Sequence, residues 1–184
     1  MLRFHAADYG STVAEILALA DPEGTPGHRL LPLAGGACVS EPARRRLEQD
    51  PLPPVVRCGL FLYLSCLDEA HKIAQEIHSA TGSYWHGLMH RQEPDFSNSA
   101  YWFRKVGRHE IFPALREAAI EIAGDRWPEV KTSAAWDPFR FLDACEEAHR
   151  RPNAQLEQTL REIQRAEWQL LFDYCAREAA GKES

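Results

Sequence analysis

The sequence predicts an all-α fold, on three observations. Apolar residues recur three and four positions apart through most of the chain, as on one face of a helix. Few residues are β-branched, and no segment between turns alternates apolar and polar residues as a strand would. The 184 residues, 45% hydrophobic and 26% charged, suit one soluble domain over 1–184 that needs no disulfide or structural metal. Usual helix lengths predict a single-domain bundle of about six to eight helices.

The first elements are short. A helix is expected from Thr12, which has the spacing of a capping box with Glu15, until Asp21 and a proline stop it. The segment 21–40 is rich in proline and glycine, and we interpret it as a packed connection in preference to a lid. Another short helix is expected at 40–49.

The most regular pattern in the chain covers residues 54–78. It predicts a long central helix, with a stripe of polar residues, including His71 and His78, beside the apolar seam. The apolar positions alternate steps of four and three: Val56, Leu60, Tyr63, Leu67, Ala70, Ala74 and Ile77.

A hairpin of two short helices is expected at 83–107. Ser83 can cap the first helix, Pro94 ends it, and Asp95 or Ser97 can cap the second. The second half of this hairpin resembles the second helix of a tetratricopeptide unit, but no further copies follow, so a solenoid is not expected.

Three more helices complete the expected bundle. Pro113 opens one that Gly124 closes, and Asp137 is an expected N-cap before a first-turn proline. Asn153 is expected to cap the last helix, which frays after Ala180.

Charge and cysteine content restrict the partners and the compartment. A net charge of −6 argues against a nucleic-acid partner, which needs a clustered positive surface. The longest uncharged apolar run, 58–67, is about half of what a membrane span requires. Five cysteines without a CxxC pair indicate reduced thiols and a cytoplasmic protein, with Cys38 interpreted as a loop thiol without function.

One long run of the sequence resembles a known family. The run is TGSYWHGLMHRQEPDFSNSAYWFRKVGRH, preceded by LDEAHKIAQEIH and followed later by WDPFRF. Together these motifs cover roughly the middle half of the chain and resemble a family of uncharacterised microbial all-α proteins with the same tryptophan- and histidine-rich signature. The resemblance indicates where function is located and implies no particular chemistry, because no activity is established for that family.

The same region contains candidate metal ligands. His86, His90 and Glu93 are spaced i, i+4 and i+7, which places them on one face of a helix. His86 and His90 are the expected ligands of a divalent metal, with Glu93, His71 or His78 completing the set. The alternative is that these histidines form hydrogen bonds that brace the hairpin against the central helix.

Arginine and aromatic side chains in the hairpin favour an anionic or aromatic small-molecule ligand. The alternative for the arginines is surface ion pairing. The expected ligand-binding residues are Tyr84, Trp85, His86, His90, Arg91, Tyr101, Trp102 and Arg104. The common hydrolase, NTPase and dinucleotide motifs are missing, so neither a reaction nor enzyme status follows from the sequence. The competing hypothesis is a non-catalytic helical module for protein interaction or self-association.

Overall fold

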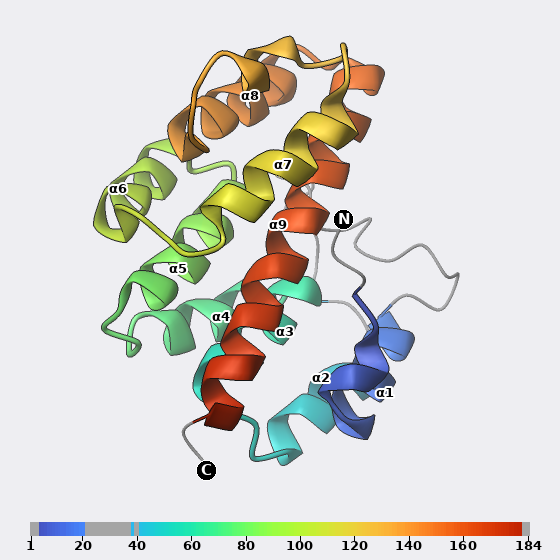
Figure 1. Ribbon diagram of the computed structural model, residues 1–184. Coiled ribbons are helices and arrows are strands. Elements are labelled where there is room, and N and C mark those ends of the chain that lie inside the picture. The colour runs from blue at the N-terminus through green and yellow to red at the C-terminus, as the bar shows by residue number, and fades with distance from the viewer. Residues whose placement is uncertain (1–3, 21–37, 39–40, 182–184) are drawn as a thin grey trace.

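The computed structural model describes residues 4–20, 38 and 41–181 (Figure 1). These residues form nine α-helices and two 3-10 helices and contain no strand, which confirms the all-α prediction. The expected loop at 21–40, apart from residue 38, lies outside the described residues. In chain order the elements are η1 (Ala6–Tyr9), α1 (Ser11–Ala20), α2 (Glu41–Gln49), α3 (Pro54–Tyr63), α4 (Leu67–Ala74), α5 (Ala80–Gln92), α6 (Phe96–Val106), α7 (Phe112–Ala123), η2 (Pro128–Lys131), α8 (Pro138–Arg150) and α9 (Ala154–Gly181).

The expected long helix over 54–78 is instead two helices. α3 ends at Tyr63 and α4 begins at Leu67, with Ser65 between them at a φ of 58°. The N–H of Cys66 donates to the carbonyl of Phe61 at 2.9 Å, the backward bond that closes a helix end in a Schellman motif. The apolar spacing continues through this turn, so it could not reveal the break. Because this segment forms two helices, the described residues contain nine α-helices, where six to eight were expected.

The central element is α9, not the segment 54–78. It has 28 residues and runs along the length of the molecule between the other helices (Figure 1). Trp168 and Phe172 of α9 belong to a hydrophobic cluster with α1 to α6, while Leu160 and Ile163 belong to a second cluster with α7 and α8. The indole N–H of Trp168 donates to the carbonyl of Gly59 at 2.9 Å. α9 therefore connects both parts of the core.

The α5–α6 hairpin forms as predicted, with one different cap. α5 begins at Ala80, so its N-cap is Ser79 and not Ser83; the Ser79 hydroxyl accepts a hydrogen bond from the N–H of Gly82 at 3.1 Å. Asp95 caps α6 as expected, accepting from the N–H of Asn98 at 3.1 Å.

Close contact holds the two helices of the hairpin together. A Cβ at Gly87 of α5 would lie 3.1 Å from the ring of Phe103 of α6, which is tighter than an ordinary contact. The Ser99 hydroxyl donates to the carbonyl of Gly87 at 2.7 Å. α6 therefore lies directly against α5, so side chains from the two helices are close neighbours.

The later helix ends agree with the sequence. Asp137 accepts hydrogen bonds from the N–H groups of two residues in the first turn of α8, at 3.0 and 3.2 Å. Asn153 accepts two in the same way, both at 3.1 Å, at the start of α9. Gly124 follows α7 with a φ of 55°, a conformation that glycine adopts without a steric penalty.

The cysteines are not all reduced, contrary to expectation. Cys38 and Cys66 form a disulfide across 28 positions, while Cys58, Cys145 and Cys175 are buried thiols. Cysteine spacing did not reveal the pair, because it forms only where the turn after α3 lies beside residue 38. The number of cysteines therefore no longer argues for a cytoplasmic protein. Among the described helices, none is long and apolar enough to cross a membrane.

Candidate metal centre

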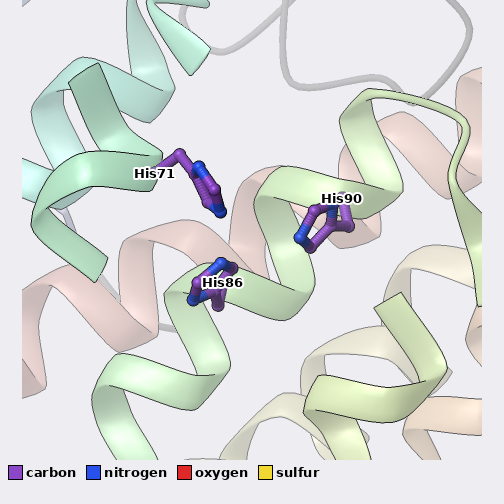
Figure 2. A group of neighbouring side chains, drawn as sticks. All are labelled: His71, His86 and His90. Carbon is purple, nitrogen blue, oxygen red and sulfur yellow. The ribbon is translucent and has the colours of Figure 1, made fainter. Parts of the chain in front are cut away.

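Three histidines from two helices lie together (Figure 2). His71 comes from α4, and His86 and His90 come from successive turns of α5. One ring nitrogen from each residue can be chosen so that all three lie within 4.8 Å of one another. The rings of His86 and His90 are nearly parallel with centroids 5.2 Å apart, and the ring of His71 meets both at a steep angle, at 4.7 and 5.7 Å. We call this group the histidine cluster.

His86 is the innermost member of the histidine cluster. It is 1% exposed, and neither of its ring nitrogens has a hydrogen-bond partner among the described residues. Its ring stacks on that of Trp102 at 3.7 Å. Burial, reinforced by His71, His90 and Lys105, lowers the pKa of His86 to about 4. The imidazole is therefore neutral at pH 7 and has a lone pair available for a metal.

His90 has a carboxylate partner. Its Nδ1 lies 3.0 Å from a carboxylate oxygen of Glu93, one turn further along α5. Burial lowers the pKa of His90, and Glu93 acts in the opposite direction. Histidines that bind metals commonly donate their second N–H to a carboxylate, which fixes the tautomer and leaves the other nitrogen as ligand. With Nδ1 beside Glu93, Nε2 is the nitrogen of His90 that remains for a metal. The side-chain nitrogen of Asn98 lies 3.1 Å from Nε2 and would have to move aside.

The structure brings together four of the five candidate metal residues. His71, His86 and His90 each offer a ring nitrogen that could serve as a ligand, and Glu93 contacts His90 from outside the cluster. His78 is exposed in the turn between α4 and α5 and lines a different cavity of about 660 Å³, together with Tyr174 of α9.

Tyr84 and Arg91, two of the expected ligand-binding residues, lie in a buried polar network on the opposite face of α5 from the histidine cluster. Arg91 pairs through Nη2 with Glu167 of α9, and both side chains are 0% exposed. The Tyr84 hydroxyl donates to Glu167 at 2.8 Å, and Nε of Arg91 donates to Gln164 at 2.8 Å. The network joins α5 to α9, and the Arg91 guanidinium already has a carboxylate partner.

The other expected ligand-binding residues occupy two further places. Trp85 is fully buried in the core, where it packs against Gly59. Trp102 is half-buried on α6, where it stacks on His86, while Tyr101 and Arg104 are exposed on the same helix. Of these four residues, Trp102 is the one that stacks on the histidine cluster.

Sequence reasoning missed Glu167, the partner of Arg91. A signal for it was present, because Glu167 stands between Ile163 and Leu171 at steps of four, in an otherwise apolar stripe. A charged residue at such a position is buried when its helix is central, and a buried charge requires a partner.

Comparison with protein-family models, with curated proteins and with solved structures finds no match for this chain. The histidine cluster and its surroundings are therefore the evidence from which function is inferred.

Proposed function

We propose that the protein binds one divalent transition-metal ion through His71, His86 and His90. The observation that carries the proposal is His86, whose two buried ring nitrogens lack hydrogen-bond partners in the described part of the chain and lie beside two further imidazoles. Buried polar groups normally have partners, so such an exception in the midst of possible ligands favours a bound ion. The pKa of about 4 keeps His86 neutral and able to bind at pH 7.

The ligand set selects the class of metal. Neutral imidazole nitrogens suit Zn²⁺, Co²⁺, Ni²⁺ and Cu²⁺, whereas Mg²⁺ and Ca²⁺ prefer oxygen. Zinc–nitrogen bonds of about 2.0–2.1 Å in a tetrahedral site place the nitrogens about 3.3 Å apart. The nitrogens here lie within 4.8 Å of one another, so modest rotations of the three side chains would close the cluster around an ion.

Three histidines leave one position of a tetrahedral ion for water or a substrate. An ion held by these three residues would act as a Lewis acid and would lower the pKa of its bound water toward 7. His71 is only partly buried, whereas His86 and His90 are buried, so His71 is the member of the cluster most accessible to solvent. The reaction class supported by this geometry is therefore attack by metal-activated water on a small substrate.

Metal analysis of untagged protein tests the proposal. We expect one Zn²⁺ or Co²⁺ per chain, and Co²⁺ should give the visible absorption of a tetrahedral site. Replacing His71, His86 or His90 with alanine should abolish binding. His78→Ala and His149→Ala change exposed histidines outside the cluster and should bind as wild type does. Stoichiometric binding that survives the loss of His86, or no binding by wild type, would refute the proposal.

Glu93 provides a second test that separates metal binding from simple packing. Glu93→Gln removes the carboxylate that orients His90 but retains a side chain of the same size. Loss of such an outer partner typically lowers metal affinity 10–100-fold. Glu129→Gln, at an exposed position in η2, is the matched control and should leave affinity unchanged. Equal affinities in the two variants would show that Glu93 has no role at the site.

A further inference from the structure

α4, the helix that carries His71, is short. It has eight residues, and a helix of that length is marginal without tertiary contacts. Its fully buried side chains are two alanines, Ala70 and Ala74, and the partly buried Leu67 and Ile73 pack against the same core. Whatever fixes the ends of α4 adds to this packing in setting the position of His71.

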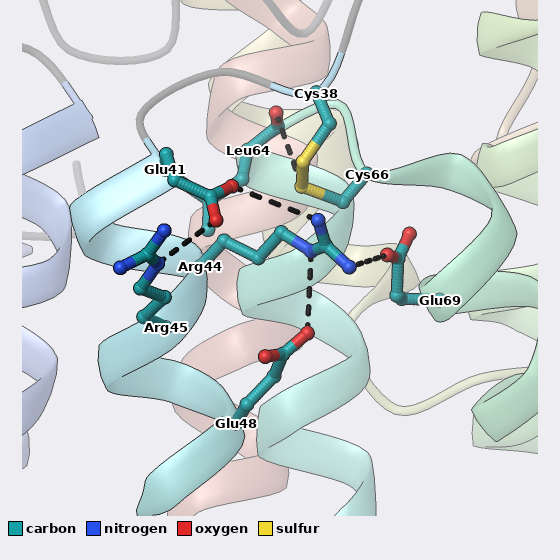
Figure 3. A network of polar contacts seen from close by, with 8 residues as sticks. All are labelled: Cys38, Glu41, Arg44, Arg45, Glu48, Leu64, Cys66 and Glu69. Carbon is teal, nitrogen blue, oxygen red and sulfur yellow. Dashed lines mark hydrogen bonds and ion pairs between the residues drawn. A yellow bond between two sulfur atoms is a disulfide. The ribbon is translucent and has the colours of Figure 1, made fainter.

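The Cys38–Cys66 disulfide fixes the beginning of α4. Cys66 is the N-cap residue directly before Leu67, and its carbonyl accepts a hydrogen bond from Ala70 at 3.1 Å. Figure 3 shows the disulfide joining this turn to Cys38, which stands three positions before Glu41 at the start of α2. His71 follows Cys66 by five residues, about 7–8 Å along a helix axis.

An ion-pair group connects α2 directly to α4. Arg44 of α2 pairs with Glu69 of α4 at 3.1 Å and with Glu48 of its own helix at 3.2 Å (Figure 3). These side chains are between 26% and 47% exposed, and ion pairs at such positions contribute little in water. The disulfide is thus the stronger of the two connections.

We propose that Cys38–Cys66 is a redox modification site that sets the metal affinity of the histidine cluster, an inference that rests on the proposed function. The oxidised pair holds α4 with His71 facing His86 and His90. Reduction releases the N-terminal end of α4, so His71 must be ordered again each time an ion binds. The oxidised protein therefore binds metal more tightly than the reduced protein.

The exchange can begin at Cys38, which is exposed, whereas Cys66 is 1% exposed. A thiolate of a dithiol reductant attacks Sγ of Cys38, the S–S bond breaks, and the Cys66 thiolate leaves and takes a proton. The second thiol of the reductant then displaces Cys38 as a thiol, and the reductant becomes a disulfide after giving two electrons. The carbonyl oxygen of Leu64, 3.7 Å from Sγ of Cys66, can accept the new S–H.

A Co²⁺ titration of oxidised and phosphine-reduced protein, followed by absorbance, tests the inference. The phosphine takes oxygen from water and becomes its oxide, and the protons go to the two thiols. We expect at least tenfold tighter binding by oxidised wild type. Cys38→Ser, which cannot form the pair, should bind as reduced wild type does, with or without phosphine. Cys145→Ser, which changes a buried thiol on α8, should retain the dependence on reductant.

The effect of bound metal on the disulfide can be measured with wild-type protein alone, so this test does not depend on a variant that folds. Metal and disulfide affect each other equally, so a tenfold effect on affinity makes the disulfide about 30 mV harder to reduce when Co²⁺ is bound. Equal Co²⁺ affinity in both redox states, together with an unchanged reduction potential of the disulfide, would refute the coupling. It would not contradict the proposed metal site. Failure of both forms to bind Co²⁺ would overturn the metal site and the coupling with it.

Discussion

Replacing Arg91 with methionine should destabilise the protein severely. Arg91 and Glu167 are both 0% exposed and pair directly, so the substitution leaves a carboxylate in the core with the Tyr84 hydroxyl as its remaining donor. Burial alone would lower the pKa of Arg91, but the attraction of Glu167 outweighs it and keeps the guanidinium charged. Arg91→Met therefore removes a full charge from the pair.

The expected loss is about 3–5 kcal/mol, the usual cost of leaving one member of a buried ion pair alone. Glu167→Met should cost at least as much, because it also leaves the Tyr84 hydroxyl without its acceptor. Replacing the whole network with apolar groups, as in Tyr84→Phe/Arg91→Met/Glu167→Met, should recover most of the loss and come within about 2 kcal/mol of wild type.

Urea unfolding at pH 7, followed by tryptophan fluorescence with chelator present, measures these free energies. Arg151→Met is the matched control, because Arg151 pairs with Glu147 at a position where the side chains are 82% and 53% exposed. It should change stability by less than about 0.5 kcal/mol. A loss below about 1 kcal/mol for Arg91→Met would show that the pair is not buried. A triple variant no more stable than the single variants would show that the unpaired charge is not the cause.

Three further predictions concern stability. Burial lowers the pKa of His109 from 6.5 to about 4 in the folded protein. Below pH 6.5 the unfolded chain therefore binds a proton that the folded protein does not bind, and the free energy of unfolding falls as the pH is lowered. His109→Phe should reduce the loss of unfolding free energy between pH 7 and pH 5 by about 2 kcal/mol, and parallel pH curves for the two proteins would contradict this. A Cβ at Gly59 would lie 2.9 Å from the buried ring of Trp85, so Gly59→Ala should lower the free energy of unfolding by about 1–3 kcal/mol; an unchanged urea midpoint would refute it. Asp137→Ala should cost about 1 kcal/mol through loss of the α8 cap, whereas exposed Asp143→Ala on the same helix should cost far less in thermal melts.

The sequence revealed those features of the fold that depend on neighbouring residues. Asp95, Asp137 and Asn153 cap their helices as expected, because a cap joins groups two or three positions apart. The turn at Ser65 escaped notice, because the apolar seam continues on both sides of it and serine does not mark a positive φ. The Cys38–Cys66 bond was missed for a related reason, since it depends on how two distant turns lie in space.

The candidate site could be predicted only for residues that are close together in the sequence. His86 and His90 are one turn apart on α5, so their spacing alone places both imidazoles on one face. His71 lies 15 positions before His86, and the sequence could not choose among His71, His78 and Glu93 as the residue that completes the set. The choice depends on the angle between α4 and α5. Arg91 was misjudged for a similar reason, because its partner Glu167 lies 76 positions away.

The place of α9 in the chain has a consequence for how the protein is made. α9 follows all the other described helices in the sequence, yet both hydrophobic clusters need its side chains. Trp168 bonds to Gly59 across 109 positions, so contacts of this kind cannot form while the earlier helices leave the ribosome. Until α9 is synthesised, the apolar helix faces that it covers in the folded protein stay exposed to other chains. Exposed apolar surfaces of this kind promote aggregation. This core therefore closes only after α9 has been synthesised.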